Sequence, residues 1–482
     1  MTTVTRQWIT SFIKGGTMGG PHYSRKSPLR TQEARATPYN SSMGLPSPPY
    51  RFLASLSATI LPVMASVAGQ KVARSIRARR GVVQRMEAWG QQQRDLHRPL
   101  LWMHAPSVGE GLQAEAVLRV LRARHPDWQL VYTHFSPSAE LLAARQEADL
   151  TDYLPWDTRA ATSRVLEAIR PTALVFAKLD LWPELACQAA ARGTQVGLVA
   201  ATVSPVSSRL RWPAVGLLQS GYASVSAAGA IAEADASRLA LLGVPRDRIE
   251  VLGDPRFDST LQLIGATDPA DPALRFRQGT PVLVAGSTWP ADEAVLLEAF
   301  AGVLRVHPEA RLILAPHEPT SAHLVGIRAR AKQLNLGDPV RLDEAAPDAR
   351  FILVDRVGVL ARLYGSAALA MVGGGFGTAG LHSVIEPAGW GIPISVGPRW
   401  QGSREAGLLA EAGGAVVLDG SNPARHLAAW WNQMLSDRGA REHQGRSAAA
   451  VINAGRGSAV RQAELVERLM RIDQRFRTAT PS

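Results

Sequence analysis

The sequence predicts two α/β domains, each built on a parallel sheet covered by helices. From residue 99 onward, short apolar runs alternate with longer helical patterns, as is typical of parallel strands joined by crossover helices. A stretch rich in Pro, Asp and Gly near 265–280 interrupts this alternation, and a second series follows it. At 482 residues, 46% of them hydrophobic, the chain is long enough to bury two cores. We therefore expect two Rossmann-like domains facing a cleft, at 97–264 and 280–435, and a C-terminal helix at 436–475.

The expected elements can be followed along the chain. In the first domain the apolar runs are LLWMHA, QLVYTHF, ALVFAKLDLW and TQVGLVAATV, and the helical patterns include GLQAEAVLRVLRARH and SAELLAARQEA. The second domain has the apolar runs PVLVAGS, RLILAPH, FILVD, ALAMVGGG, IPISVGP and GAVVLD, with the helical pattern EAVLLEAFAGVLRVH. Open parallel sheets bind ligands beyond the carboxyl ends of their strands, so the turns after these runs are the places to search for a site.

The net charge of +12 is confined to the N-terminal segment. Residues 1–86 contain 13 Lys and Arg side chains and a single acid, Glu33, so the rest of the chain has no net charge. A domain that binds nucleic acid would be expected to carry the positive excess itself. No aromatic residue interrupts 71–85 to offer a stacking platform. We expect no nucleic-acid partner.

The first 86 residues divide into two parts. Residues 1–50 are rich in Ser, Thr, Pro, Gly and Arg, and we interpret them as a disordered or mis-assigned N-terminal extension. Residues 52–70 are uncharged but contain several polar residues and Pro62, which makes them borderline for crossing a bilayer, since that takes roughly 20 mostly apolar residues. The six cations in 71–85 would suit an anionic cytoplasmic leaflet. We expect 51–86 to form a membrane-associated helix with a basic flank; the alternative is an amphipathic helix packed on the body.

A glycine-rich segment gives the clearest nucleotide signal. Residues 368–394, ALAMVGGGFGTAGLHSVIEPAGWGIPI, are expected to form strand, turn, helix and strand. Glycines let the backbone approach a ligand closely, and the N-terminus of the following helix offers free N–H groups to a phosphate. A dinucleotide site would need an acid at the end of the next strand, but 395–403 has none. Glu386 could instead hold the ribose of a mononucleotide; the alternative is that it caps or packs its helix.

A second signal lies in residues 102–116, WMHAPSVGEGLQAEA, where a strand runs into a helix through Ser107 and Glu110. Ser-x-x-Glu is also a capping box, in which both side chains satisfy backbone N–H groups. The position at the C-terminal edge of the first strand favours a function, because Glu110 could there remove a proton from an attacking hydroxyl as a general base.

Four other residues have plain structural interpretations. His104 and His134, at strand ends, are expected to be ordinary polar edge residues, and Trp182 to form a packing corner. His317 is open between a phosphate contact and loop packing.

With these motifs, the chain resembles a divergent member of the bacterial 3-deoxy-D-manno-octulosonic acid (Kdo) transferases. In that family an apolar N-terminal helix precedes a strand and the motif S-V-G-E, which Ser107 to Glu110 match. YLPWD, DLWPEL and GSTWPADE are similar to later landmarks of the family, in the same order. RLILAPHEP, VDRVGVLARLY and the glycine-rich segment look like its donor-site segments. The resemblance covers roughly residues 50–435.

The resemblance implies a metal-independent inverting glycosyltransferase of the GT-B architecture, without a cofactor. It would move Kdo, or a related 2-keto sugar acid, from CMP-Kdo to a lipid A precursor in lipopolysaccharide biosynthesis, at the cytoplasmic side of the cell inner membrane. Glu110 would be the general base, and the first domain would bind the acceptor through Ser107, Gly109, Lys178 and Asp180. The second domain would bind the donor through Ser287, Thr288, His317, Gly358, Gly373, Gly374, Gly375, His382, Ser383 and Glu386.

Several positions depart from the family's pattern. Its E-T-E-L-W-P motif begins with glutamate, whereas this chain has Lys178, and the second glutamate becomes Asp180. The family's Pro-Arg-His becomes Pro-His-Glu at 316–318, and its Gly-Gly-His-Asn becomes Gly-Leu-His-Ser at 380–383. Two alternatives therefore stay open: a UDP-sugar-dependent transferase or epimerase of the same fold, and a non-catalytic membrane-associated protein that binds a sugar nucleotide or a lipid.

Overall fold

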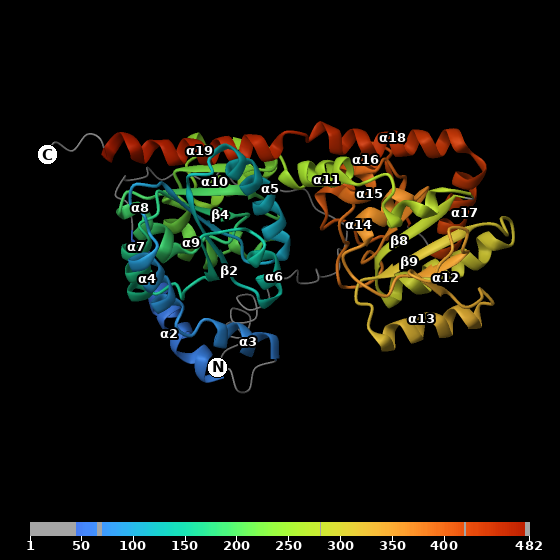
Figure 1. The fold of residues 1–482 in the computed structure, drawn as a ribbon, viewed down its shortest axis with the longest axis horizontal. Coiled ribbons are helices and arrows are strands. Elements are labelled where there is room, and N and C mark those ends of the chain that lie inside the picture. The colour runs from blue at the N-terminus through green and yellow to red at the C-terminus, as the bar shows by residue number, and fades with distance from the viewer. Residues whose placement is uncertain (1–44, 65–69, 280, 419–420, 478–482) are drawn as a thin grey trace. The chain divides into compact units, whose positions relative to one another are not determined.

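The computed structural model describes residues 45–64, 70–279, 281–418 and 421–477. Most of the extension expected at 1–50 lies outside these residues. The described chain divides into two compact units (Figure 1). Unit 1 contains the described residues up to Arg256 together with those from Gly457 onward, and unit 2 runs from Phe257 to Arg456.

The described part of unit 1 is built on a parallel sheet of seven strands in the order β3-β2-β1-β4-β5-β6-β7. β1, β2 and β4 are buried along their whole length, which explains why they read as continuous apolar runs. With β4 at its centre and β1 beside it, the sheet has the Rossmann order. The strands are β1 (Leu100–His104), β2 (Gln129–His134), β3 (Leu150–Tyr153), β4 (Ala173–Ala177), β5 (Gln195–Ala201), β6 (Ala227–Ala230) and β7 (Ile249–Val251).

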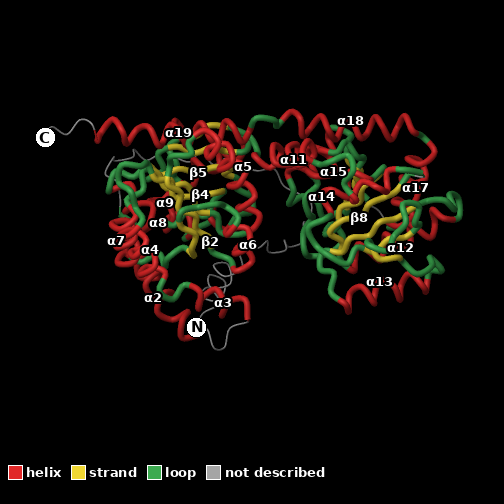
Figure 2. The backbone as a smooth tube through the Cα atoms, viewed as in Figure 1, coloured by secondary structure: helices red, strands yellow, loops and turns green. Residues whose placement is uncertain are grey.

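Helices cover both faces of this sheet (Figure 2). Alternate side chains of β1 enter the two cores, with Leu100 and Trp102 on one face and Leu101 and Met103 on the other. One face is covered by α4 (Val82–Gln92), α7 (Arg159–Ile169), α8 (Pro183–Ala191), α9 (Ala214–Ala223) and α10 (Glu233–Leu242). The other is covered by α5 (Val108–Arg124), α6 (Glu140–Ala144) and α19 (Ser458–Arg477). Short 3₁₀ helices are η1 (Pro137–Ala139), η2 (Ser208–Leu210) and η3 (Arg246–Arg248).

The described part of unit 2 repeats this architecture, with parallel strands in the order β10-β11-β9-β8-β12-β13-β14. The strands are β8 (Val282–Thr288), β9 (Arg311–Pro316), β10 (Val340–Arg341), β11 (Phe351–Leu353), β12 (Leu369–Val372), β13 (Ile394–Val396) and β14 (Ala415–Val417). One face carries α12 (Pro290–Leu304), α13 (Ser321–Gln333) and α17 (Pro423–Ser436). The other carries α11 (Pro255–Ala266), α14 (Leu360–Leu363), α15 (Ile385–Gly389), α16 (Arg404–Glu411) and α18 (Arg438–Ala454), with η4 (Pro272–Arg277) and η5 (Tyr364–Ser366).

The C-terminal segment differs from the single helix expected at 436–475. The helical pattern is divided at Asp437, whose side chain caps the start of α18, and again at Gly457, whose φ of 84° is left-handed. After this second break α19 packs against the sheet of unit 1 (Figure 1), where Gln462 accepts a hydrogen bond from the Ala200 amide at 3.2 Å. The C-terminal helix is therefore part of the core of unit 1.

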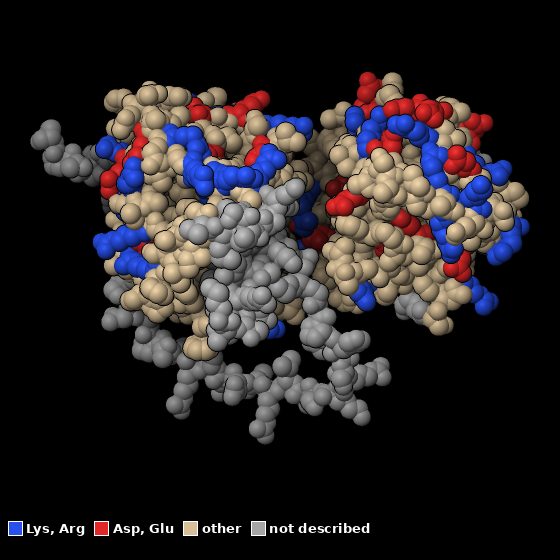
Figure 3. Space-filling model, turned by 90° about the horizontal axis from the view of Figure 1, so that it is seen from below, with Lys and Arg blue, Asp and Glu red and all other residues tan. Residues whose placement is uncertain are grey.

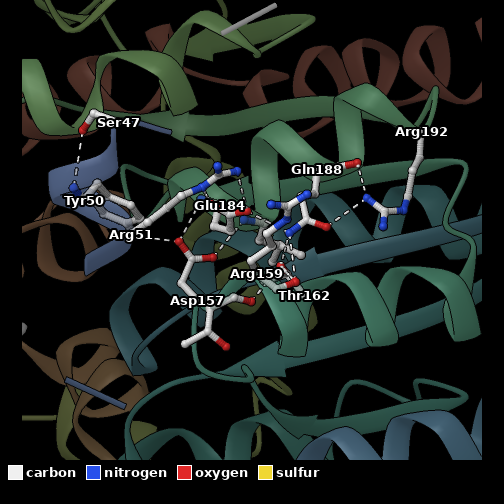
Figure 4. A network of polar contacts seen from close by, with 11 residues as sticks. Ser47, Tyr50, Arg51, Asp157, Arg159, Thr162, Glu184, Gln188 and Arg192 are labelled. Atoms are coloured by element: carbon white, nitrogen blue, oxygen red, sulfur yellow. Dashed lines mark hydrogen bonds and ion pairs between the residues drawn. The ribbon is translucent and has the colours of Figure 1, made fainter. Parts of the chain in front are cut away.

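The segment 51–86, expected to be a membrane-associated helix with a basic flank, falls in three helices: α2 (Pro48–Met64), α3 (Gln70–Ala78) and α4. The start of α2 is fixed to unit 1 by buried polar contacts (Figure 4). Tyr50 donates to Asp157 at 2.6 Å, and Arg51 donates to both oxygens of Glu184 at 2.7 and 3.0 Å. Of the helices in the described residues, none has the length and apolar character to cross a membrane.

Not all of the basic flank is free to face a membrane, contrary to the expectation. Arg79 is only 3% exposed, and its guanidinium lies 3.7 Å from the centre of the Phe135 ring. Arg85 forms two hydrogen bonds of 2.7 Å with Asp152. Along α4, Met86 is fully buried in the core of unit 1. Two cations of the basic flank, Arg79 and Arg85, therefore help to fix the N-terminal helices to unit 1.

Candidate functional site

In unit 1 the turns after β1 and β4 bring Glu110 and Lys178 together. These strands are neighbours in the sheet, so their carboxyl ends lie side by side. Glu110 lies in the first turn of α5, and Lys178 directly follows β4. The Lys178 Nζ donates to Glu110 Oε1 at 3.0 Å. The structure thus joins the expected base to a residue at which the chain departs from the family's pattern.

The backbone holds Lys178 in an uncommon conformation. Its φ is 65°, in the left-handed region that non-glycine residues rarely adopt. Its amide donates to the Val199 carbonyl of β5 at 2.8 Å, which fixes the turn against the sheet. Strained residues of this kind persist where the surrounding structure imposes them, and they are concentrated at functional sites.

Ser107 and Glu110 do not form the capping box that was the alternative interpretation of Ser-x-x-Glu. Ser107 occupies the N-cap position of α5, but its side chain makes no capping hydrogen bond. Its hydroxyl donates instead to Glu110 Oε2. Gly109 lies between the two residues, and a Cβ added there would be 3.9 Å from the Ser107 Oγ, so space alone does not require a glycine.

The electrostatics of this cluster favour an ionised Glu110. Burial alone would raise the pKa of this carboxyl, whose side chain is 16% exposed. The charge of Lys178 and the hydrogen bonds from Ser107 and Lys178 outweigh burial, and the pKa is lowered below its ordinary value. Glu110 is therefore a carboxylate at neutral pH, the form that can accept a proton.

Asp180 forms a second polar group at the same edge of the sheet. Its carboxylate accepts from the Trp182 indole at 3.2 Å and lies 3.4 Å from both His104 Nε2 and an Arg209 guanidinium nitrogen. Burial would raise its pKa, but His104 most strongly, then Arg209 and Trp182, lower it overall. His104 is fully buried, and its Nδ1 lies 3.0 Å from the Thr133 carbonyl. It therefore helps to fix Asp180, a function that its position at a strand end did not reveal.

In unit 2 an aromatic cluster lies beyond the ends of β8, β9 and β12. The rings of His317 and His382 stack with their centres 4.2 Å apart, and the Trp289 ring centre is 4.8 Å from that of His317. The Trp289 indole donates to His382 Nε2 at 3.0 Å. Burial, and then the nearby His317, lower the pKa of His382 to about 4, so this ring is neutral and can accept that bond. Trp289 was not identified from the sequence, although it lies in the segment GSTWPADE.

Thr288 and Ser287 end the central strand of unit 2. Ser287 has a left-handed φ of 54°, as Lys178 has in unit 1. The Thr288 hydroxyl donates to Glu293 at 3.0 Å, and the other oxygen of Glu293 lies 2.9 Å from His323. Burial is the largest influence on Glu293 and raises its pKa overall. The hydroxyl of Thr288 is therefore already used within the fold.

The glycine-rich turn is organised by Asp292, another residue that the sequence did not single out. Its buried carboxylate accepts from the amides of Gly374 at 2.8 Å, Phe376 at 3.1 Å and Trp289 at 2.9 Å. The Gly373 amide donates to the Gly286 carbonyl at 2.9 Å. The prediction that the amides of Gly373 and Gly374 are free to bind a phosphate is therefore wrong, because both are bonded within the fold.

Close packing explains why glycines are needed in this turn. A Cβ on Gly373 would lie 2.4 Å from the Ser287 carbonyl oxygen, and one on Gly375 would lie 2.7 Å from the Gly397 backbone. The helix expected directly after the turn is also shorter and later than predicted, since α15 has five residues and begins at Ile385. A helix this short gives little support to a phosphate-binding dipole.

The remaining predicted donor residues lie in loops or short elements of unit 2. Gly358 is exposed in the loop after β11, with a left-handed φ of 86°. Ser383 donates to Glu386, which lies in the first turn of α15. Among the described residues, no group of three or more His, Cys, Asp and Glu side chains is arranged to hold a metal ion.

The two parallel sheets define the fold class, the GT-B architecture that is found in glycosyltransferases and related epimerases. UDP-GlcNAc 2-epimerase from Neisseria meningitidis, solved with UDP-GlcNAc, superposes with a TM-score of 0.55 at 14% identity, covering 77% of this chain and 99% of the other. A glycosyltransferase from Rickettsia africae gives a TM-score of 0.51 at 10% identity, covering 78% and 98%. At these identities the likeness shows the fold alone.

Sequence comparisons show which family the chain is similar to. The family described as 3-deoxy-D-manno-octulosonic-acid transferase (kdotransferase) matches residues 74–259. The 3-deoxy-D-manno-octulosonic acid transferase of Haemophilus influenzae is 24% identical over 374 residues, which cover 76% of this chain and 86% of that protein. The Bordetella pertussis enzyme of the same name is 28% identical over 383 residues, with the same two coverages. Over most of its length the chain is therefore similar to Kdo transferases, which are glycosyltransferases.

Proposed function

We propose that this protein is an inverting glycosyltransferase that moves Kdo, or a related 2-keto sugar acid, from CMP-Kdo to a lipid A precursor in lipopolysaccharide biosynthesis. The observation that carries the proposal is the position of Glu110, a largely buried carboxylate beyond the end of β1 that Lys178 and Ser107 hold in place. The two relatives named above support the choice of sugar, because both are named for its transfer.

Glu110 would act as the general base. One of its oxygens takes the proton from the acceptor hydroxyl, and the acceptor oxygen attacks the anomeric carbon of the sugar. As the bond from that carbon to the CMP phosphate oxygen breaks, its electron pair stays on CMP. Attack from the side opposite to CMP inverts the configuration. The lowered pKa of Glu110 keeps the carboxylate ionised for this step.

Unit 2 would bind the donor, CMP-Kdo, and we propose no further cofactor. His317 is exposed beside His382, so its ring can reach a ligand beyond the end of β9. Glu386, oriented by Ser383, would hold the ribose hydroxyls. The amides of Gly373 and Gly374 are bonded within the fold, so these two glycines would shape the donor-binding turn and would not hold the phosphate.

We further propose that the protein works at the cytoplasmic side of the cell inner membrane. α2 exposes Phe52, Leu53 and Leu56, whose exposed fractions are 67%, 37% and 41%. Arg77 and Arg80, in and just after α3, are also exposed. Apolar side chains close to cations suit the interface of an anionic bilayer. On the face shown in Figure 3, basic and acidic side chains are interspersed over the described residues of both units, in keeping with the neutral balance of 87–482.

The test is direct. The purified full chain is incubated with CMP-Kdo generated in situ and a tetraacylated lipid A precursor, and the lipid product is followed by mass spectrometry. We expect a product heavier by one or more Kdo residues, and its loss in Glu110→Gln. Glu115→Gln, which changes a carboxylate five residues further along α5, is the matched control and should retain activity.

The same preparations distinguish the alternatives. A ligand that binds only the folded protein raises the melting temperature. Protection by CMP and not by UDP is expected, whereas protection by UDP alone would favour the UDP-sugar alternative. Protection by CMP without any transfer to the lipid would favour the non-catalytic alternative.

A further inference from the structure

The ion pair between Lys178 and Glu110 is unequally exposed. The Lys178 side chain is 42% exposed, whereas that of Glu110 is 16% exposed. The second pair at this edge has the same asymmetry, with the Arg209 side chain 40% exposed and that of Asp180 25% exposed. An Arg209 guanidinium nitrogen lies 3.4 Å from Asp180 Oδ1. In both pairs the cation is the partner that a solute can reach. Because Lys178 and Arg209 are partly in water, an anionic group of a ligand can reach either cation.

Both oxygens of Glu110 are occupied in this arrangement. Oε1 accepts from Lys178 and Oε2 accepts from Ser107. A general base must instead place an oxygen within hydrogen-bond distance of the proton that it removes. Each oxygen can accept a second hydrogen bond, but loss of the bond from Lys178 would leave Oε1 wholly free to take the proton. The bond from Lys178 is the one that joins Glu110 to a different element and to the more exposed partner.

We propose that Lys178 is a positioning residue that leaves Glu110 for an oxyanion of the acceptor, a phosphate or a carboxylate, when the acceptor binds. The exchange frees Oε1 for the acceptor hydroxyl and removes the cation that weakens Glu110 as a base. The inference rests on the proposed function, and it adds that the acceptor is anionic close to its reacting hydroxyl.

Few other charges face Glu110. From β2, Tyr132 lies close enough to interact with it electrostatically, and Glu115 lies on α5 itself. At the start of α6, Glu140 is engaged by Arg74 and Tyr153. On α19, Glu467 pairs with Arg124 and His125 at the other end of α5. Lys178 is therefore the cation whose movement would change the basicity of Glu110.

The experiment measures transfer by the full chain to two acceptors, the lipid A precursor and the same lipid without its phosphates, across pH. The fall of kcat/KM at acid pH, its acid limb, reports the pKa of the base in the free enzyme. The acid limb of kcat reports the pKa of the base in the enzyme with acceptor bound. In the wild type we expect the acid limb of kcat to lie at higher pH than that of kcat/KM. In Lys178→Met the two limbs should coincide, because the cation is absent in both states.

The acceptor dependence provides the second measurement. Lys178→Met should raise KM about tenfold for the phosphorylated lipid, the size of one charge-assisted contact, and leave KM for the dephosphorylated lipid unchanged. Lys178→Arg should restore the preference for phosphate. Coincident limbs in the wild type, or an equal rise of KM for both lipids, would overturn the exchange while leaving the proposed function intact. A wild type that transfers sugar to neither lipid would overturn the proposed function itself.

Discussion

The Gly374 amide donates to the Asp292 carboxylate at 2.8 Å, although the two residues are 82 positions apart. Asp292 lies in the first turn of α12, and it also accepts from two further amides. One carboxylate therefore joins the end of the central strand β8 to the glycine-rich turn after β12. The shape of this turn depends on a buried acid as much as on its glycines.

Replacing Asp292 should destabilise unit 2. Asp292→Ala leaves three amides without their acceptor, and a buried unsatisfied donor costs about 1–3 kcal/mol. We expect the melting temperature to fall by about 5 °C or more. Glu298→Gln, at an exposed position of the same helix, is the control. Equal melting temperatures for Asp292→Ala and the control would show that the turn keeps its shape without this carboxylate.

Much of the fold could be predicted from local patterns, because fully buried strands such as β1 and β4 appear as apolar runs. Contacts between distant segments could not. The bond from Gly374 to Asp292, and the return of α19 to unit 1 after Gly457, depend on tertiary structure. Arg79 was interpreted as an exposed cation because nothing near it in sequence shows the Phe135 ring that covers it.

The candidate site was predicted unevenly for the same reason. Glu110 follows a strand, so the rule that ligands bind beyond strand ends leads to it, whereas Lys178 was named only through the resemblance to the family; the two follow neighbouring strands. His317 also follows a strand, and His382 was named through the resemblance; the structure brings the two together. The rule gave no sign of which amides and hydroxyls are already bonded. Thr288, for example, ends a strand as expected but donates to Glu293.

The contact between Arg51 and Glu184 should hold α2 on unit 1. The Glu184 side chain has no exposed surface, so Arg51→Ala leaves a buried carboxylate without its cation. Breaking such a pair costs about 3–5 kcal/mol, against about 0–1 kcal/mol for an exposed one. Arg164→Ala, which breaks the more exposed pair with Glu87, is the matched control. Thermal unfolding should show a clearly lower melting temperature for Arg51→Ala only. Similar melting curves for both variants would show that the contact between Arg51 and Glu184 does not stabilise the fold.

Acid should weaken the fold through the buried His134 and the half-buried His382. Burial lowers the pKa of His382 and of His134 to about 4, below the ordinary value of 6.5. Between pH 6.5 and 4 the unfolded chain therefore binds protons that the folded chain does not, and stability falls as the pH falls through this window. His382→Gln and His134→Gln should each flatten the dependence of the melting temperature on pH. Unchanged slopes in both variants would show that other groups cause the loss.

His317→Ala should weaken donor binding without weakening the fold. The side chain is exposed and lies beyond the carboxyl end of β9, whereas His307 precedes the other end of the strand. Loss of one ligand contact from the ring should raise the dissociation constant for CMP about tenfold. Calorimetric titration with CMP measures the change, with His307→Ala as the control. An unaltered affinity in His317→Ala would place this residue outside the donor site.

Ser107→Ala separates a catalytic arrangement from a helix cap. If Ser107 capped α5, its loss would cost about 1 kcal/mol of stability. Its hydroxyl instead donates to Glu110 and makes no capping bond, so the melting temperature should barely change. Transfer to the lipid should fall about tenfold, because the carboxylate loses one of the two bonds that orient it. Thr158→Ala is the comparison, since the Thr158 hydroxyl does cap its helix, α7, and its loss should lower the melting temperature without affecting the rate. A Ser107→Ala variant that melts like Thr158→Ala and transfers sugar at the wild-type rate would restore the capping interpretation and leave Lys178 alone to orient the base.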